Sequence, residues 1–186
     1  RFVHIRVFIL FLISLPLFSF AQQIPKQEPI KYHFLFEENK GQFHDEVIYR
    51  CELPTGYLYL EKTGLTYLEV HQGDKAKLNT AFHDQVHGKK LPALSVRHHA
   101  FKVNFNHSER DATIDGYAAK EYYYNYYIGS DQTKWATDVN LFEALVYHNI
   151  YPFIDLLFYM DHKGSLKYEW HIREGGNIND IEIEYT

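Results

Sequence analysis

The sequence is poor in cysteine, in clusters of basic residues and in long apolar runs. Cys51 is its single cysteine, so no disulfide can form within these 186 residues. The 19 Lys and Arg residues are outnumbered by 24 Asp and Glu and are scattered, which argues against nucleic-acid binding because that needs a clustered basic surface. After residue 20 no apolar run approaches the roughly 20 residues of a membrane span, so no transmembrane segment is expected in the mature part.

Aromatic residues are unusually frequent. The chain holds 16 Tyr and 14 Phe, and aromatic side chains make up 17% of it. Because Tyr and Phe favour strands over helices, this composition favours β structure. The length suits one domain, and a hydrophobic content of 46% excludes a chain that is disordered throughout.

The N-terminal segment is typical of an export signal. Arg1 and Arg6 precede an uncharged run from Val7 to Phe20. The small residues Ser19 and Ala21 then mark a cleavage site directly after Ala21. A membrane anchor is the alternative, but the run is short and is interrupted by a proline. We therefore expect residues 1–21 to be a signal peptide, and the protein to be exported to the cell surface or the extracellular medium.

The rest of the chain divides into a linker and a folded region. Residues 22–32 contain two prolines and predict an extended linker, and residues 33–186 predict the domain. The chain begins at Arg1 rather than Met and stops at Thr186 inside an alternating pattern. We therefore expect a truncated domain from a larger protein that continues beyond residue 186.

A period of two runs through most of the folded region and predicts strands. The alternating segments are 57–60, 65–70, 101–105, 141–148, 154–160, 166–172 and 181–186. Glu61–Gly64 predicts a hairpin turn in which Gly64 takes a positive φ, and Asp161–Ser165 predicts a second hairpin. Residues 71–93 predict a polar excursion with room for a short helix. Roughly eight strands joined by turns indicate an all-β fold, an antiparallel β-sandwich that is incomplete at its C-terminal end.

Two residues are assigned to the core from these patterns. Cys51 is expected to be a small buried side chain in a strand rather than a catalytic thiol. In 166–172 the apolar residues occupy alternate positions and share one face of the strand. Trp170 lies on that face and is predicted to be a core anchor.

Three strings resemble the motifs of one family, in the same order and spacing. Phe36–Phe43 (FEENKGQF) resembles its opening motif, and Asn125–Asp131 with Lys134-Trp135 resembles its NYFIGNDPSKW region. Tyr147–Leu156 and Leu166–Glu169 resemble its YxNVYPGIDL and LEYDF segments. The family is an N-terminal domain of unassigned function. It occurs, especially in Bacteroidota, in exported proteins with SBBP (seven-bladed β-propeller) repeats, PKD-type Ig-like repeats or a gliding-motility-associated C-terminal sorting segment.

The resemblance implies a multidomain, mostly β surface protein, exported by type IX secretion, whose partners include downstream repeat domains of the same chain. It supplies no catalytic activity and therefore no catalytic residues. Phe153 stands where the family usually has Gly, and Gly175-Gly176 where it often has Pro-Gly. Because glycine tolerates backbone angles that phenylalanine does not, we expect one turn to be affected.

Twelve histidines invite a metal hypothesis. His83 and His87 have the spacing of one helix face, whereas His98 and His99 are adjacent and would face opposite ways on a strand. A zinc site needs three or four converging ligands, and only one pair has a workable spacing. We therefore expect no bound metal and no other cofactor.

Paired carboxylates are the other candidate for catalysis, because glycoside hydrolysis needs two of them. The candidates are Glu37, Glu38, Asp45, Asp131 and Asp155. Glu37–Asn39 precedes a glycine and is interpreted as part of a turn. Asp155 lies at the start of a strand, where we favour a structural carboxylate over a cation ligand. Nothing in this set singles out a catalytic pair.

The run Tyr122–Tyr127 is the most distinctive local feature. Tyr122, Tyr124 and Tyr126, together with Trp135, form the candidate ligand or interface surface, because exposed aromatic rings stack on sugars and are enriched at protein interfaces. Packing of the same rings in the core is the favoured alternative. Both interpretations leave the chain without a catalytic residue.

These observations predict a non-enzymatic N-terminal module of a large exported bacterial surface protein, acting in adhesion, assembly or display. The alternative is a carbohydrate-binding module or an accessory domain of an exported hydrolase. The expected external partners are polysaccharides or other surface proteins.

Overall fold

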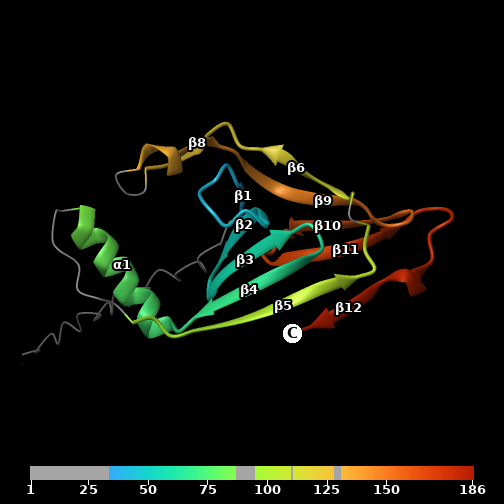
Figure 1. Ribbon diagram of the computed structural model, residues 1–186, viewed down its shortest axis with the longest axis horizontal. Helices are drawn as coiled ribbons and strands as arrows, with labels where there is room; N and C mark the ends of the chain where they lie inside the picture. The colour runs from blue at the N-terminus through green and yellow to red at the C-terminus, as the bar shows by residue number, and fades with distance from the viewer. Residues whose placement is uncertain (1–33, 87–94, 110, 128–130) are drawn as a thin grey trace, which may run out of the picture. The chain divides into compact units, whose positions relative to one another are not determined.

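Antiparallel strands make up most of the fold. The computed structural model describes residues 34–86, 95–109, 111–127 and 131–186 (Figure 1). The strands are β1 (Phe36–Glu38), β2 (Val47–Leu53), β3 (Gly56–Glu61), β4 (Gly64–Val70), β5 (His98–Asn106), β6 (Thr113–Ala119), β7 (Tyr124–Tyr126), β8 (Ala136–Val139), β9 (Leu141–Tyr151), β10 (Ile154–Met160), β11 (Leu166–Ile172) and β12 (Glu182–Tyr185). The helices are α1 (Gln72–Val86) and the 3₁₀ turns η1 (Gln132–Lys134) and η2 (Ile178–Asp180). The predicted signal peptide, its cleavage point Ala21 and the linker 22–32 lie outside the described residues.

Ten of the strands form one sheet. Its order is β11-β10-β9-β1-β2-β3-β4-β5-β12, with β6 paired to β9 beside this path, and every pairing is antiparallel. The short strands β7 and β8 form a separate pair. The predicted hairpins are confirmed, since β3 pairs with β4 and β10 pairs with β11 in continuous register.

The sheet curls so that its two ends face each other across one core. Trp170 of β11 packs edge-on against Phe105 of β5, the neighbour of β12, with ring centroids 5.9 Å apart. Tyr151 of β9 donates its hydroxyl proton toward the carbonyl of Glu182 in β12 at 2.9 Å. In Figure 1 the orange strands β9–β11 accordingly lie across from β3–β5, and the red strand β12 runs beside β5. The predicted all-β, sandwich-like fold is confirmed.

The core is built from the alternate positions of these strands. Its fully buried large side chains include Phe36, Leu58, Leu60, Leu141, Leu145, Tyr147, Tyr151, Ile154, Leu156 and Phe158. Cys51 is buried among them, as predicted, and burial raises the pKa of its thiol to about 12. A thiol with that pKa stays protonated at neutral pH and is a poor nucleophile.

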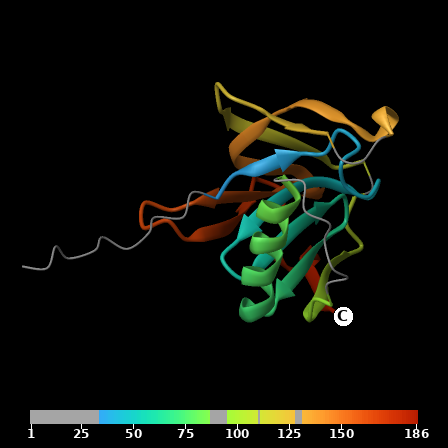
Figure 2. The same cartoon turned by 90° about the vertical axis from the view of Figure 1, so that its left-hand side faces the viewer.

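The polar excursion after β4 contains a longer helix than the sequence predicted. Helix α1 runs for 15 residues, and Figure 2, in which it faces the viewer, shows it beside the sheet. Its sequence has no sustained apolar stripe, which is why the pattern indicated only a short helix. An ion pair anchors it instead: Asp74 in the first turn is buried, and Arg97, just before β5, donates to its carboxylate at 2.8 Å.

The prediction that Gly64 takes a positive φ was wrong. Gly64 is the first residue of β4 and is absent from the residues with positive φ. It pairs with Asn104, and a Cβ at its position would lie 2.7 Å from the Val103 carbonyl oxygen. Glycine is therefore required at this position because the backbone of β5 approaches so closely.

Candidate functional site

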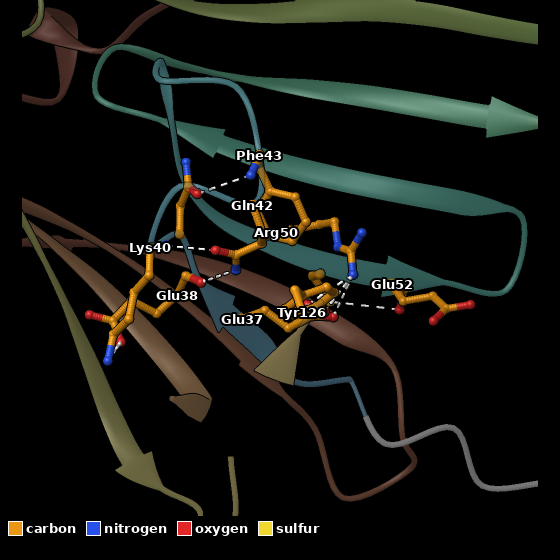
Figure 3. A network of polar contacts seen from close by, with 10 residues as sticks. Glu37, Glu38, Lys40, Gln42, Phe43, Arg50, Glu52 and Tyr126 are labelled. Atoms are coloured by element: carbon orange, nitrogen blue, oxygen red, sulfur yellow. Dashed lines mark hydrogen bonds and ion pairs between the residues drawn. The ribbon is translucent and has the colours of Figure 1, made fainter. Parts of the chain in front are cut away.

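A buried ion pair lies on the outer face of the sheet, on the side opposite the core. Glu37 of β1 is 5% exposed, and one guanidinium nitrogen of Arg50 in β2 donates to both of its carboxylate oxygens, at 2.8 and 3.0 Å. The hydroxyl of Tyr126 in β7 donates to the same carboxylate and lies 3.2 Å from Arg50. Figure 3 shows these three side chains meeting between β1, β2 and β7.

Aromatic rings enclose the guanidinium group. Arg50 lies 4.2 Å from the centroid of the Phe43 ring and 5.0 Å from that of Tyr57. Phe43 also packs edge-on against Tyr126 and Tyr59, with centroids 6.0 and 6.4 Å away. A cation over ring faces in a partly desolvated site is attracted by the ring quadrupoles. We call these residues, Glu37, Phe43, Arg50, Tyr57, Tyr59 and Tyr126, the Arg50 cluster.

The loop after β1 places Phe43 in this cluster. Asn39 accepts the backbone N–H groups of Gly41 and Phe43 on its side-chain oxygen, at 3.0 and 3.1 Å. Its amide nitrogen donates to the Val47 carbonyl at 2.7 Å, and Gly41 takes φ +105°. Asn39 thus fixes the turn, as predicted, but Glu37 and Glu38 lie in β1 and were wrongly assigned to the turn.

Within the Arg50 cluster the pKa values of both Arg50 and Tyr126 are raised. Burial lowers the pKa of Arg50, but the Glu37 carboxylate raises it more, so the net shift is upward. Burial and the hydrogen bond to Glu37 raise the pKa of Tyr126 well above its ordinary value. With their pKa values raised, Arg50 and Tyr126 both keep their protons across the physiological range, which suits a structural support.

The other tyrosines of the run Tyr122–Tyr127 lie on the surface. Tyr122, Tyr123, Tyr124 and Tyr127 are 51%, 54%, 42% and 61% exposed. The rings of Tyr122 and Tyr124 are 6.5 Å apart, and Tyr127 packs edge-on against the half-buried Trp135 at 5.2 Å. Of the run, only Tyr126 is held by the Arg50 cluster, so packing of the run in the core was the wrong interpretation. We call these four tyrosines and Trp135 the tyrosine surface.

A groove adjoins the Arg50 cluster through Phe43 and Tyr59. Its volume is about 350 Å³, and it is lined by Phe43, His44, Glu46, Val47, Tyr59, Glu61, Thr66 and Lys102. In it Glu61 accepts a hydrogen bond from the Thr66 hydroxyl at 2.7 Å and one from Lys102 at 2.9 Å. This Phe43 groove therefore combines aromatic walls with a few fixed polar groups, as small-molecule sites do.

The structure does not bring the predicted carboxylates together as a catalytic pair. Glu38 accepts from Asn140 at 2.8 Å, and Asp131 caps η1 by accepting the Thr133 N–H at 3.1 Å. Asp155 accepts the backbone N–H of Asn149 at 2.7 Å, which supports its structural role. Asp45 is exposed in the loop before β2.

The histidines of the metal hypothesis are spread over two elements. His83 lies in α1, and His87 is outside the described residues. His98 and His99 begin β5, where they pair with Val70 and Glu69. Within the described parts of the chain, no three His, Cys, Asp or Glu side chains gather as a metal site would require.

Sequence reasoning found the tyrosines but missed most of the residues that support and flank them. Arg50, Tyr57 and Tyr59 occupy the outward positions of β2 and β3, where alternate residues are the buried ones. That alternation was the available signal, since it placed an arginine and two tyrosines on one face. The pairing of Glu37 with Tyr126 had no signal, because 89 residues separate them.

Comparison with known proteins gives a family for this fold. Residues 36–186 match the model of a family described as a domain of unknown function (DUF7948), and the chain therefore belongs to that family. No curated protein matches the chain. No solved structure matches it either. Within the described residues no helix has both the length and the apolar character to cross a membrane.

Proposed function

We propose that this chain is a non-enzymatic module of a large exported bacterial surface protein, and that it acts in adhesion by binding polysaccharide. The tyrosine surface carries the proposal. Its four tyrosines are 42–61% exposed within a stretch of six residues, and the rings of Tyr122 and Tyr124 are 6.5 Å apart. Rings of this kind present an apolar face and a polar hydroxyl, a combination suited to sugars, which have apolar faces and hydroxyl edges.

The Arg50 cluster supports this assignment because it makes the platform rigid. Tyr126 is bonded to both Glu37 and Arg50, and β7 is therefore held against β1 and β2. Preorganised rings lose little conformational entropy when they bind a ligand. The same bonds occupy the Glu37 carboxylate, which favours binding over hydrolysis as the activity of this face.

The Phe43 groove supplies polar groups beside the Arg50 cluster. The ammonium nitrogen of Lys102 lies 2.9 Å from a carboxylate oxygen of Glu61, and both groups present hydrogen-bonding atoms to a ligand. Sugar hydroxyls are donors as well as acceptors, so a carboxylate and an ammonium group side by side are suitable partners. We assign the groove to the end of a polysaccharide segment that lies across the tyrosine surface.

Export and surface location rest on the N-terminal segment and on the family resemblance of the three motifs. The basic residues, the apolar run and the small residues before the cleavage point predict a mature protein that begins at Gln22. N-terminal sequencing of the protein recovered from outside the cells tests this. A mature protein that still carries Arg1 would contradict it.

The binding proposal is tested with a glycan array and matched tyrosine variants. Tyr122→Ala and Tyr124→Ala should each weaken polysaccharide binding about tenfold, the loss of one stacking contact. Tyr168→Ala is the matched control, because Tyr168 is 57% exposed but lies on β11. Thermal melts of all three variants should match the parent within a few degrees, since each replaced side chain is exposed.

The outcomes separate the alternatives within the proposal. Binding that falls in both surface variants and not in Tyr168→Ala supports the tyrosine surface as the site. An array without signal removes polysaccharide as the ligand and leaves a protein partner for adhesion. Equal losses in all three variants would show general adsorption and overturn the assignment.

A further inference from the structure

A row of directly facing residues crosses the outer face of the sheet from the Arg50 cluster to the Phe43 groove. Glu37 faces Arg50 on β2, and Arg50 faces Tyr59 on β3. Tyr59 in turn faces Thr66 on β4, and Thr66 faces Lys102 on β5. Neighbouring strands lie about 4.8 Å apart, so this cross-strand row is roughly 19 Å long. It connects the support of the tyrosine surface with the groove.

The loop before β2 forms one wall of the groove and is held in place. Asn39 donates to the carbonyls of His44 and Val47, at 3.0 and 2.7 Å. The Val47 N–H donates back to the His44 carbonyl at 3.0 Å and closes the turn. Glu46 lies between these two residues and lines the groove. Its carboxylate is therefore presented to a ligand from a fixed backbone, which lowers the entropy lost on binding.

The opposite wall carries a carboxylate and an ammonium group that neutralise each other. Glu61 accepts hydrogen bonds from Lys102 at 2.9 Å and from Thr66 at 2.7 Å. The hydrogen bond to Glu61 raises the pKa of Lys102, so the ammonium group keeps its charge. The Glu61 side chain is only 17% exposed. This pair contributes hydrogen-bonding atoms to the groove but no net charge.

Glu46 gives the groove its negative charge. Its side chain is exposed, and within the described residues no lysine or arginine forms an ion pair with it. Lys102 is near enough for Glu46 to raise its pKa, but its hydrogen bond goes to Glu61. An acidic sugar would meet the Glu46 carboxylate as a like charge. An ammonium group has three N–H donors and no acceptor, and would pair with it.

On the basis of the polysaccharide binding proposed above, we infer that the sugar held in the Phe43 groove carries a free, protonated amino group. Its ring packs against Phe43 and Tyr59, and its ammonium group pairs with Glu46. The polysaccharide follows the cross-strand row over β2–β5. An N-acetylated sugar lacks the charge that Glu46 attracts, and a uronic acid brings the charge that Glu46 repels. Amino sugars are therefore bound in preference to both.

Matched oligosaccharides of equal length test this preference on the full chain. β-1,4-linked oligomers of glucosamine, N-acetylglucosamine and glucose share one backbone and differ only at carbon 2, and a β-1,4-linked glucuronic acid oligomer is the acidic counterpart. Titration calorimetry at about pH 6.5 keeps the amino groups charged, because amines beside electron-withdrawing carbons ionise near pH 8. Every protein carries His44→Gln, so that the one histidine lining the groove cannot change its charge.

The glucosamine oligomer should bind about threefold more tightly than the N-acetylated and glucose oligomers, the size of one exposed ion pair. The glucuronic acid oligomer should bind most weakly. Salt at about 0.5 M should remove the preference, because it screens exposed charges but leaves ring stacking in place.

Three variants locate the preference. Glu46→Gln should abolish it while the glucose oligomer binds as before. Glu174→Gln is the matched control, since Glu174 is an exposed carboxylate in the turn after β11 and does not line the groove. Lys102→Met leaves Glu61 unneutralised and should increase the preference for glucosamine. A decrease in Lys102→Met, or equal losses in Glu46→Gln and Glu174→Gln, would overturn the inference.

The outcomes also separate this inference from the proposed function. Oligosaccharides that bind without a preference for the amino group, and that bind less tightly to Tyr124→Ala, would show the inference wrong and polysaccharide binding right. A glycan array that gives signal only for sugars without a free amino group would have the same meaning. No binding of any glycan would overturn both.

Discussion

At the scale of single residues, the Glu37–Arg50 pair explains why the outer face of β1 and β2 is ordered. Glu37 and Arg50 have side chains that are 6% and 18% exposed, so both charges have lost most of their hydration. Such a pair is tolerated only when its remaining groups are also bonded or packed. Tyr126 and Phe43 provide such contacts, while the buried Nε of Arg50 has no hydrogen-bond partner among the described residues. The pair therefore ties β7 and the loop after β1 to the sheet.

The first prediction follows from this burial. Glu37→Ala leaves the Arg50 charge buried without a partner and should lower the free energy of unfolding by about 3 kcal/mol. Tyr126→Phe removes two hydrogen bonds to charged groups, one donated to Glu37 and one accepted from Arg50, and should cost about 2 kcal/mol. Urea denaturation of the two variants and the parent measures both values. A cost below about 1 kcal/mol for Glu37→Ala would mean that water replaces the lost carboxylate.

Single-residue predictions from sequence succeeded where local pattern decided the outcome. Cys51 is buried as predicted, because its neighbours in β2 alternate. Phe153, at the position where the sequence resemblance implied a glycine, takes φ +60°, so the turn keeps a backbone angle that glycine favours. The half-buried state of Trp170 was not predictable, because it depends on the opening between β11 and β12.

At the scale of elements, helix α1 is held by its N-terminal turn. The Asp74 carboxylate accepts hydrogen bonds from the side chain and backbone N–H of Arg97 and from Lys77. The hydrogen bonds from the Arg97 side chain, and then those from Lys77 and the Arg97 N–H, lower the pKa of Asp74 well below its ordinary value. This carboxylate ties the first turn of α1 to the start of β5, and Lys75 adds a second tie by donating to the carbonyls of Leu53 and Pro54 at 3.2 and 3.3 Å.

The second prediction concerns the acid stability of this contact. Since the folded state lowers the pKa of Asp74 below its unfolded value of about 4, the stability it contributes is complete above about pH 5. That contribution is lost as the pH falls below 4 toward the folded-state pKa. Hydrogen exchange of α1 followed from pH 6 to pH 3 should show the helix loosening in the parent.

Asp74→Asn provides the comparison for this experiment. In this variant the backbone amides of α1 should be less protected from exchange already at pH 6, and their protection should change little when the pH is lowered to 3. Asp45→Asn is the control, because Asp45 is an exposed loop carboxylate. An acid dependence that is the same in Asp74→Asn as in the parent would assign the loosening to other carboxylates.

Most of the long strands were predicted from sequence, and the short ones were not. β10 and β11 have the predicted bounds, because β10 is a nearly continuous apolar run between two turns and the apolar residues of β11 alternate with polar ones. β1 and β7 have three residues each, too few to show a period of two. β6 has a glycine and two alanines and little burial, so its pairing with β9 had no hydrophobic pattern to indicate it.

At the scale of the whole molecule, the sequence predicted the all-β fold class but not how the sheet curls to bring its two ends together. Alternation over many strands indicates antiparallel sheets, but it does not specify which strands end the sheet or how it curls. The closure depends on contacts between distant residues, above all those of Trp170 with Phe105 and Tyr151 at 5.9 and 6.0 Å. The contact with Phe105 joins β11 to β5 on the far side of the core, and Tyr151 of β9 in turn donates to the Glu182 carbonyl of β12.

The last prediction tests that closure. Because Trp170 is half-buried, Trp170→Ala should lower the free energy of unfolding by about 2 kcal/mol, less than the 3–5 kcal/mol of a fully buried tryptophan. Trp170→Phe keeps an aromatic ring against Phe105 and should cost about half as much. Tyr168→Ala, on the same strand but mostly exposed, should cost under about 1 kcal/mol. Urea denaturation with circular dichroism measures all three. Equal costs for Trp170→Ala and Tyr168→Ala would show that β11 contributes little to holding the two ends of the sheet together.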